Sequence, residues 1–149
     1  MNDTTANLGE LTITRIYDAP RDLVFECMIT PEHLTHFWGP VGVTTPLDRI
    51  KVDPKPGGVF DTVMVNDVDG TEYPSHGVYV DVDVPNKLSW TEPDVEGGMM
   101  TSVTFKDLGD GRTEVVIHQT NVPEMYRSPE AQEGFNSSLD RFAAYISTL

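Results

Sequence analysis

The sequence predicts an α+β domain in which a curved antiparallel sheet of about seven strands wraps around one long C-terminal helix. From about residue 43 to residue 120, the chain alternates in the manner of β-strands and is punctuated by short turns. Residues 129–148 instead carry apolar side chains at helical spacing. The predicted order is strand, two short helices, six strands and a final helix, β-α-α-β6-α.

The first strand and the two short helices are predicted from the N-terminal quarter of the chain. Residues 11–17 alternate with β-branched enrichment, which is typical of a strand. Apolar residues at helical spacing in 23–28 predict a short helix. Thr30-Pro31 suits the start of a second one, which stops near Gly39-Pro40. Residues 1–8 are polar, and we expect them to be disordered.

The six later strands are predicted at residues 43–52, 59–65, 73–84, 88–91, 99–105 and 113–120. Pro46 interrupts the first of these six. Within the longest strand, alternation places four valines on one face: Val78, Val80, Val82 and Val84. An apolar sheet face must be covered, and the C-terminal helix is the one predicted element of suitable size. We therefore expect space between sheet and helix, closed at one end by the short helices.

The composition suits one acidic domain over residues 1–149. With 24 acidic and 10 basic residues, the formal charge is −14, which argues against nucleic-acid or anionic-membrane partners. No apolar run is long enough to predict a membrane span. Cys27 is the only cysteine, so an internal disulfide is excluded. The first ten residues lack signal-peptide features, and we expect a cytoplasmic protein.

Several short motifs occur together in a characteristic order. They include Asp18-Ala19-Pro20, Thr30-Pro31-Glu32-His33-Leu34, Phe37-Trp38-Gly39-Pro40, Gly77-Val78-Tyr79, Leu88-Ser89-Trp90-Thr91-Glu92 and Ser138-Leu139-Asp140-Arg141-Phe142. Over residues 11–146 the set resembles the family named for the activator of the heat-shock-protein-90 ATPase, in the START-like (SRPBCC, helix-grip) superfamily. The resemblance implies a helix-grip fold with a deep apolar cavity. Phe37 and Phe135 stand where the family more often has Trp, which we expect to alter the cavity's shape.

Nine residues are predicted to line this cavity. They are Phe37, Trp38, Phe60, Met64, Tyr79, Trp90, Met99, Phe135 and Leu139. Each could instead serve only as packing in the core, because both uses bury the same side chain. For Trp38 the two alternatives are a ligand-contacting wall and an anchor for the second short helix.

Catalytic and metal-binding signatures are missing from the sequence. There is no nucleophile triad, phosphate loop, dinucleotide fingerprint or zinc motif, so no cofactor and no metal is expected. Asp61 and Tyr79 would be catalytic candidates only if they faced the cavity beside a displaced pKa. Arg141 is expected to be structural, paired with an acidic residue on the sheet or a loop.

Three functions stay open on the sequence alone. The preferred one is binding of a small apolar molecule, by a monomer or homodimer without nucleic-acid binding or membrane insertion. The first alternative is a cyclase- or aromatase-like enzyme that uses the same cavity. The second is the co-chaperone role that the family's name implies.

Overall fold

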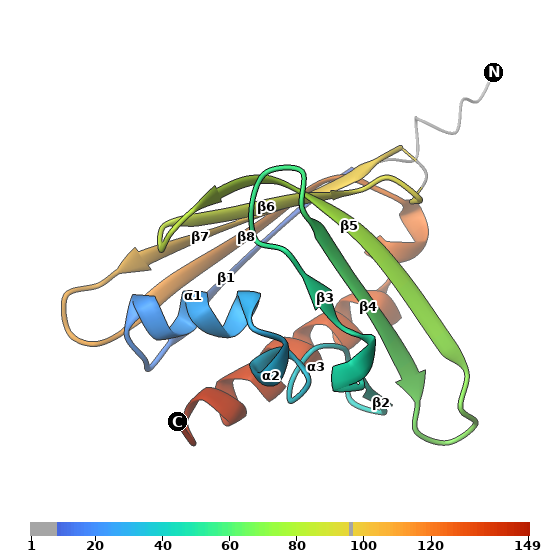
Figure 1. Ribbon diagram of the computed structural model, residues 1–149, viewed down its shortest axis with the longest axis horizontal. Coiled ribbons are helices and arrows are strands. Elements are labelled where there is room, and N and C mark those ends of the chain that lie inside the picture. Colours follow the sequence, from blue (N-terminus) through green and yellow to red (C-terminus); the bar gives the residue numbers. More distant parts are fainter. Residues whose placement is uncertain (1–8, 96) are drawn as a thin grey trace.

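The computed structural model describes residues 9–95 and 97–149, and its sheet curves over the helices (Figure 1). The strands are β1 (Gly9–Tyr17), β2 (Val43–Thr44), β3 (Lys51–Val52), β4 (Val59–Asn66), β5 (Glu72–Asp83), β6 (Lys87–Glu92), β7 (Met99–Asp107) and β8 (Thr113–Val122). The helices are α1 (Arg21–Ile29), α2 (Pro31–Leu34) and α3 (Pro129–Ile146), with single 3-10 turns η2 (Leu47–Arg49) and η3 (Glu124–Arg127). The disorder expected for residues 1–8 lies outside the described residues.

The eight strands of the described residues belong to one antiparallel sheet. Its order is β1-β8-β7-β6-β5-β4-β2, and β3 pairs with β4 beside β2. From β4 to β8 each strand pairs with the next one in the chain, as the short predicted turns require. The predicted α+β class and element order are confirmed. Within residues 9–95 and 97–149 the strand count exceeds the predicted seven by one, because residues 43–52 form two strands.

The split of residues 43–52 follows from Thr45 and Pro46. Thr45 is buried, and its hydroxyl donates to the carbonyl of Trp38 at 2.7 Å, which draws the chain toward the turn after α2. Pro46 has no N–H to donate to a neighbouring strand. Its carbonyl instead accepts from the backbone N–H of Arg49 at 3.0 Å, which forms the η2 turn. The pairing with β4 therefore stops and resumes two residues after η2.

A bulge in β5 changes which valines face the core. The pairing with β6 shifts between Tyr79 and Asp81, so Val80 is an extra residue on the outer side and is 47% exposed. Tyr79 before the bulge is 1% exposed, and Val82 after it pairs with inward-facing Leu88 and packs on the core. The prediction that four valines share one face is therefore wrong.

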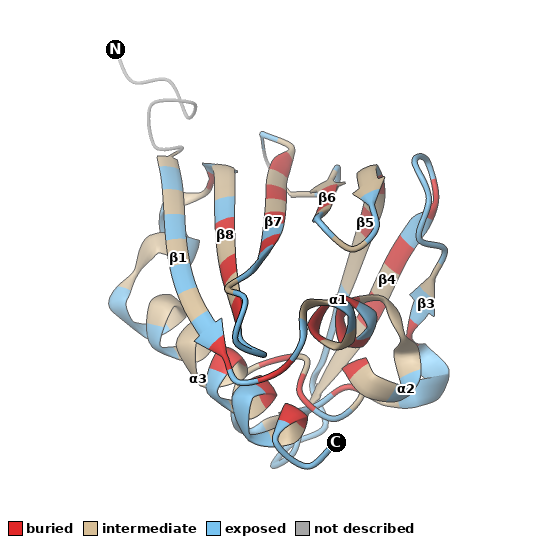
Figure 2. Cartoon of the chain, turned by 90° about the vertical axis from the view of Figure 1, so that its left-hand side faces the viewer, coloured by how far each residue is buried: buried red, intermediate tan, exposed pale blue. Residues whose placement is uncertain are grey.

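The three α-helices lie on the concave side of the sheet (Figure 1). Ser128 caps α3 by accepting a hydrogen bond from the backbone N–H of Ala131 at 3.1 Å. Phe142 on the inner face of α3 packs against Tyr17, with ring centroids 4.8 Å apart. Phe25 on α1 packs against Phe105 of β7 at 5.0 Å. Figure 2 shows α1 within the curve of the sheet, and the buried residues of this helix are Val24, Phe25, Cys27 and Met28.

Candidate functional site

The turn after α2 carries two adjacent aromatic residues, Phe37 and Trp38, whose rings point to different parts of the structure. The backbone N–H groups of Phe37 and Trp38 both donate to the carbonyl of Leu34, at 3.1 and 2.9 Å. Phe37 is 2% exposed and stacks on Phe142, with ring centroids 4.3 Å apart. Trp38 is half-buried and meets Phe60 of β4 edge-on at 5.1 Å. One ring therefore anchors the turn on α3, while the other reaches across to the sheet.

Gly39 lets the chain turn directly after these rings. Its φ is +100°, a conformation that L side chains rarely adopt. A Cβ at this position would also lie 2.7 Å from a methyl group of Val43 and 2.8 Å from the sulfur of Met64. Glycine therefore permits the close approach of this turn to β4.

Arg141 of α3 holds the same turn from the helix side. Its Nη1 donates to the carbonyl oxygens of Gly39, Pro40 and Val43 at 2.8, 3.0 and 3.2 Å. The Ser138 hydroxyl donates to the Phe37 carbonyl at 3.1 Å. Arg141 is structural, as expected, but the prediction of an acidic partner is wrong: the guanidinium binds main-chain carbonyls instead.

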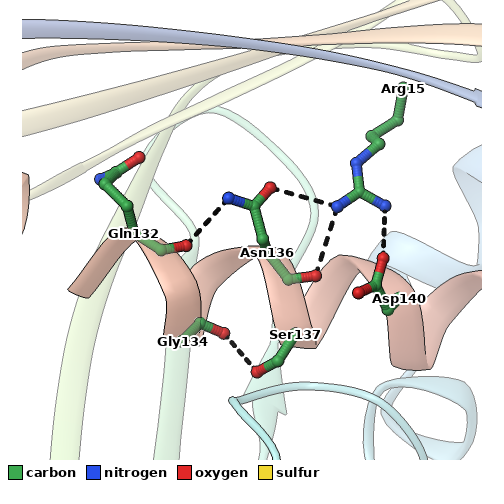
Figure 3. Close-up of polar contacts among 6 residues, drawn as sticks. All are labelled: Arg15, Gln132, Gly134, Asn136, Ser137 and Asp140. Carbon is green, nitrogen blue, oxygen red and sulfur yellow. Dashed lines mark hydrogen bonds and ion pairs between the residues drawn. The ribbon is translucent and has the colours of Figure 1, made fainter. Parts of the chain in front are cut away.

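Arg15 of β1 binds α3 at Asn136 and Asp140 (Figure 3). Its Nη1 donates to Oδ1 of Asp140 at 2.8 Å, and its Nη2 donates to the side-chain and main-chain oxygens of Asn136 at 3.1 and 3.3 Å. Asn136 in turn donates to the carbonyl of Gln132 at 3.0 Å. Together with Arg141, these contacts tie α3 to β1 and to the turn after α2.

Between the sheet and α3 lies a cavity of about 230 Å³. This volume is well above that of a single-water void and somewhat below the ~300 Å³ at which typical ligand pockets begin. Seven of the residues predicted from the sequence contribute to its lining: Phe37, Trp38, Phe60, Met64, Trp90, Phe135 and Leu139. Most of the other lining groups are apolar as well, and α1 contributes Met28.

Tyr79 and Met99, the remaining two predicted residues, are buried but lie outside this lining. The Tyr79 ring stacks on Phe60 at 5.6 Å and so lies behind the cavity wall. Burial raises the pKa of its hydroxyl, which has no hydrogen-bond partner among the described residues. Met99 pairs with Glu92 at the far end of β6 and lies outside the main core cluster.

The cavity wall also has a polar part that was not predicted from the sequence. It is formed on the sheet by Thr62, Ser75, Glu92, Thr101 and Gln119. The alternation of side chains along a strand could have predicted these residues. Each lies two residues from a neighbour that faces the interior and therefore on the same face of its strand, as Glu92 does relative to Trp90. The Gln119 side-chain amide donates to the Thr101 hydroxyl at 3.2 Å.

Glu92 is the acidic residue of this wall. Its Oε1 accepts a hydrogen bond from the Ser75 hydroxyl at 3.1 Å. Burial raises the pKa of the carboxyl group, and the Ser75 hydrogen bond opposes that effect without cancelling it. Glu92 and Ser75 also border an outer pocket of about 680 Å³, so they lie where the two spaces adjoin.

The other catalytic and metal candidates do not assemble into a site. Asp61 is not part of the cavity lining, and its Oδ1 pairs with Nδ1 of His76 at 2.5 Å. Cys27 is buried in α1, and burial raises the pKa of its thiol to about 11, which disfavours the reactive thiolate. Within residues 9–95 and 97–149, no group of three His, Cys, Asp or Glu side chains could hold a metal ion.

The sequence profile described as "Activator of Hsp90 ATPase homolog 1-like protein" matches residues 18–147. This match covers most of the chain, including every element that lines the cavity. The chain belongs to this family. The resemblance inferred from the ordered motifs is thereby confirmed.

Solved structures of bacterial proteins share the fold of this Hsp90-ATPase-activator-like chain. A protein from Nitrosomonas europaea is 23% identical, with 96% of each chain covered and a TM-score of 0.82. A protein from Chromobacterium violaceum is 21% identical, with 91% of this chain and 96% of its own chain covered, and its TM-score is also 0.82. A protein from Silicibacter pomeroyi is 22% identical, with 94% of this chain and 99% of its own chain covered and a TM-score of 0.77. No curated protein sequence matches.

Within residues 9–95 and 97–149, no helix combines the length and the apolar character that a membrane crossing requires.

Proposed function

We propose that this protein binds a small apolar molecule in the cavity between the sheet and α3. The observation that carries the proposal is an unfilled space of about 230 Å³ walled mainly by aromatic and aliphatic side chains. A ligand that enters it removes apolar surface from water, which contributes about 25 cal/mol per Å². Among the described residues, its lining contains one acidic side chain and no histidine or cysteine, so a carboxylate pair and a nucleophile–histidine pair are both missing there.

The way α3 is fixed supports this proposal. An apolar void normally loses dispersion contacts, so neighbouring elements tend to close it. Here Arg15 binds α3 at Asp140 and Asn136, and Arg141 of α3 binds the turn after α2. These polar contacts tie α3 to β1 and to the turn after α2, so the position of the helix does not depend on side chains that fill the cavity.

The two alternatives find less support. A cyclase-like enzyme would need Tyr79 or Asp61 at the cavity, but Tyr79 lies behind its wall and Asp61 pairs with His76 outside it. A co-chaperone role would need an exposed apolar patch, whereas the apolar lining that supports the proposal faces the interior cavity. Cytoplasmic location and a monomeric or homodimeric state remain predictions.

Native mass spectrometry of protein purified from its own host tests the proposal. We expect a co-purifying small molecule that dissociates when the protein is denatured. Gly134→Leu should abolish its retention, because Gly134 lines the cavity and a Cβ there would contact only Pro40, at 3.5 Å. Glu133→Leu places the same side chain on the exposed face of α3 and is the matched control.

Two results would contradict the proposal. The first is that protein purified from the host shows no bound small molecule at any protein concentration measured. The other is equal retention by Gly134→Leu and Glu133→Leu, which would place the bound molecule outside the cavity. Circular dichroism of both variants ensures that only folded protein is compared.

A further inference from the structure

The boundary between the inner cavity and the outer pocket carries an unusual carboxyl group. Glu92 contributes to both linings, and so do Pro40, Met64 and Ser75. Its only polar contact among the described residues is the Ser75 hydroxyl at 3.1 Å, and it forms no ion pair with any of them. A partly buried carboxylate without a cationic partner is costly.

Three aromatic rings converge on the inner side of this boundary. The ring centroids of Trp38 and Phe60 lie 5.1 Å apart, those of Phe60 and Trp90 also 5.1 Å, and those of Trp38 and Trp90 6.4 Å. Trp90 lies on the same face of β6 as Glu92, two residues earlier. The faces of such rings attract cations within about 6 Å, most strongly for tryptophan.

The charges around the two spaces are one-sided. No lysine or arginine among the described residues lines either the cavity or the outer pocket. The outer pocket adds Asp94 to Glu92, and its one basic side chain, His76, is paired with Asp61. The whole chain carries a formal charge of −14, which draws cations toward the molecule and repels anions.

We propose that the ligand is a hydrophobic amine whose ammonium group binds Glu92 and the neighbouring aromatic rings while its apolar part fills the inner cavity. This inference rests on the proposed function and names the class of ligand for it. An ammonium group supplies the cationic partner that Glu92 lacks, and it stays near the wetter outer pocket. A neutral ligand would leave the carboxylate unpaired, and a carboxylic acid would be repelled.

Isothermal titration calorimetry with a matched probe pair tests the inference. The probes are 2-naphthylmethylamine and 2-naphthylmethanol at pH 7.5, which differ in one charged group on the same ring system. For the unaltered protein we expect the amine to bind about tenfold tighter than the alcohol, which is the size of one charge-assisted hydrogen bond. This comparison requires no variant and therefore cannot fail through misfolding.

Two variants assign the preference to Glu92. Glu92→Gln keeps the side-chain shape and an acceptor for Ser75 but removes the charge, so we expect about a tenfold loss for the amine and little change for the alcohol. Glu133→Gln makes the same charge change on the exposed face of α3 and should keep the preference. Thermal unfolding of each variant reports the folded fraction.

The outcomes separate this inference from the proposed function. If both probes bind equally and Glu92→Gln changes neither, the cavity binds apolar molecules and the amine class is overturned. If Glu92→Gln weakens both probes alike, Glu92 supports the wall and does not select a cation, which also overturns it. If neither probe binds the unaltered protein, the amine proposal fails and the proposed function loses its support as well.

Discussion

Phe37 and Trp38 are adjacent in the chain but have separate structural roles. The Phe37 ring is almost fully enclosed and stacks on Phe142 of α3. The Trp38 ring keeps part of its surface free and meets Phe60 at the cavity. We therefore interpret Phe37 as the residue that anchors the turn on α3, and Trp38 as the one that forms part of the cavity wall.

Alanine substitutions should separate these roles. Phe37→Ala is expected to lower the free energy of unfolding by about 3–5 kcal/mol, since it leaves a void in the core. Trp38→Ala should cost roughly 1–2 kcal/mol, because a half-buried ring forfeits less buried area, but it should abolish ligand retention. Urea denaturation measures the former and native mass spectrometry the latter. A larger stability loss for Trp38→Ala than for Phe37→Ala would reverse the assignment.

Glu92 should make stability depend on pH in a defined direction. Its folded-state pKa is raised by burial, so the folded protein holds this proton more tightly than the unfolded chain does. The contribution of Glu92 is therefore fully present below the ordinary glutamate pKa of 4.5 and is lost as pH rises through the raised value.

Glu92→Gln should remove this dependence. We expect the variant and the unaltered protein to have similar stability near pH 4, and the variant to become the more stable one as pH increases toward 7.5. Urea denaturation at a series of pH values measures the difference. Glu133→Gln, on the exposed face of α3, controls for the change in net charge. A difference that is constant with pH would show that burial does not raise the pKa of Glu92.

At the scale of elements, regular periodicity was predictable and irregular backbone was not. The helical spacing of apolar residues in 129–148 predicted α3 with nearly correct bounds. The β5 bulge at Val80 could not be read from the sequence, since alternating valines fit a regular strand equally well. The partners of Arg141 were equally hidden, because main-chain carbonyls carry no residue-specific signal.

Gly134 in α3 offers a test of the helix itself. Gly134→Ala should raise the free energy of unfolding by about 0.5–1 kcal/mol, because alanine loses less backbone entropy in a helix. Its Cβ would meet Pro40 at an ordinary contact distance of 3.5 Å. Gly77→Ala in β5 is the contrasting variant, since its Cβ would press on the Phe60 carbonyl at 3.0 Å and should destabilise. A loss of stability in Gly134→Ala would mean that α3 is packed more tightly there than described.

At the scale of the whole molecule, the location of the cavity was more predictable than its chemistry. Its apolar wall was predicted from aromatic residues near turns and from apolar residues on the inward faces of strands, because apolar side chains must face the interior. Tyr79 and Met99 were placed in that wall although they are only buried, and burial alone does not distinguish core from cavity. Glu92 was missed because an acidic residue in a strand ordinarily faces solvent.

The excess of acidic residues should destabilise the folded molecule in dilute buffer. A formal charge of −14 spread over a compact surface is self-repulsive, and unfolding relieves the repulsion by separating the charges. Added salt screens it, with the Debye length falling from about 30 Å at 0.01 M to about 10 Å at 0.1 M. We therefore expect the midpoint of thermal unfolding to rise by several degrees between these concentrations of sodium chloride.

The range of salt concentration over which the unfolding midpoint rises identifies the cause of the rise. Screening acts mostly below about 0.15 M, where the Debye length is still comparable to the spacing of surface charges, whereas effects on apolar hydration grow at much higher salt. A steep early rise that then flattens, measured by differential scanning calorimetry, supports self-repulsion. A midpoint that is flat or falls across this range would mean that local pairs such as Arg15 with Asp140 outweigh the repulsion, since salt weakens exposed ion pairs.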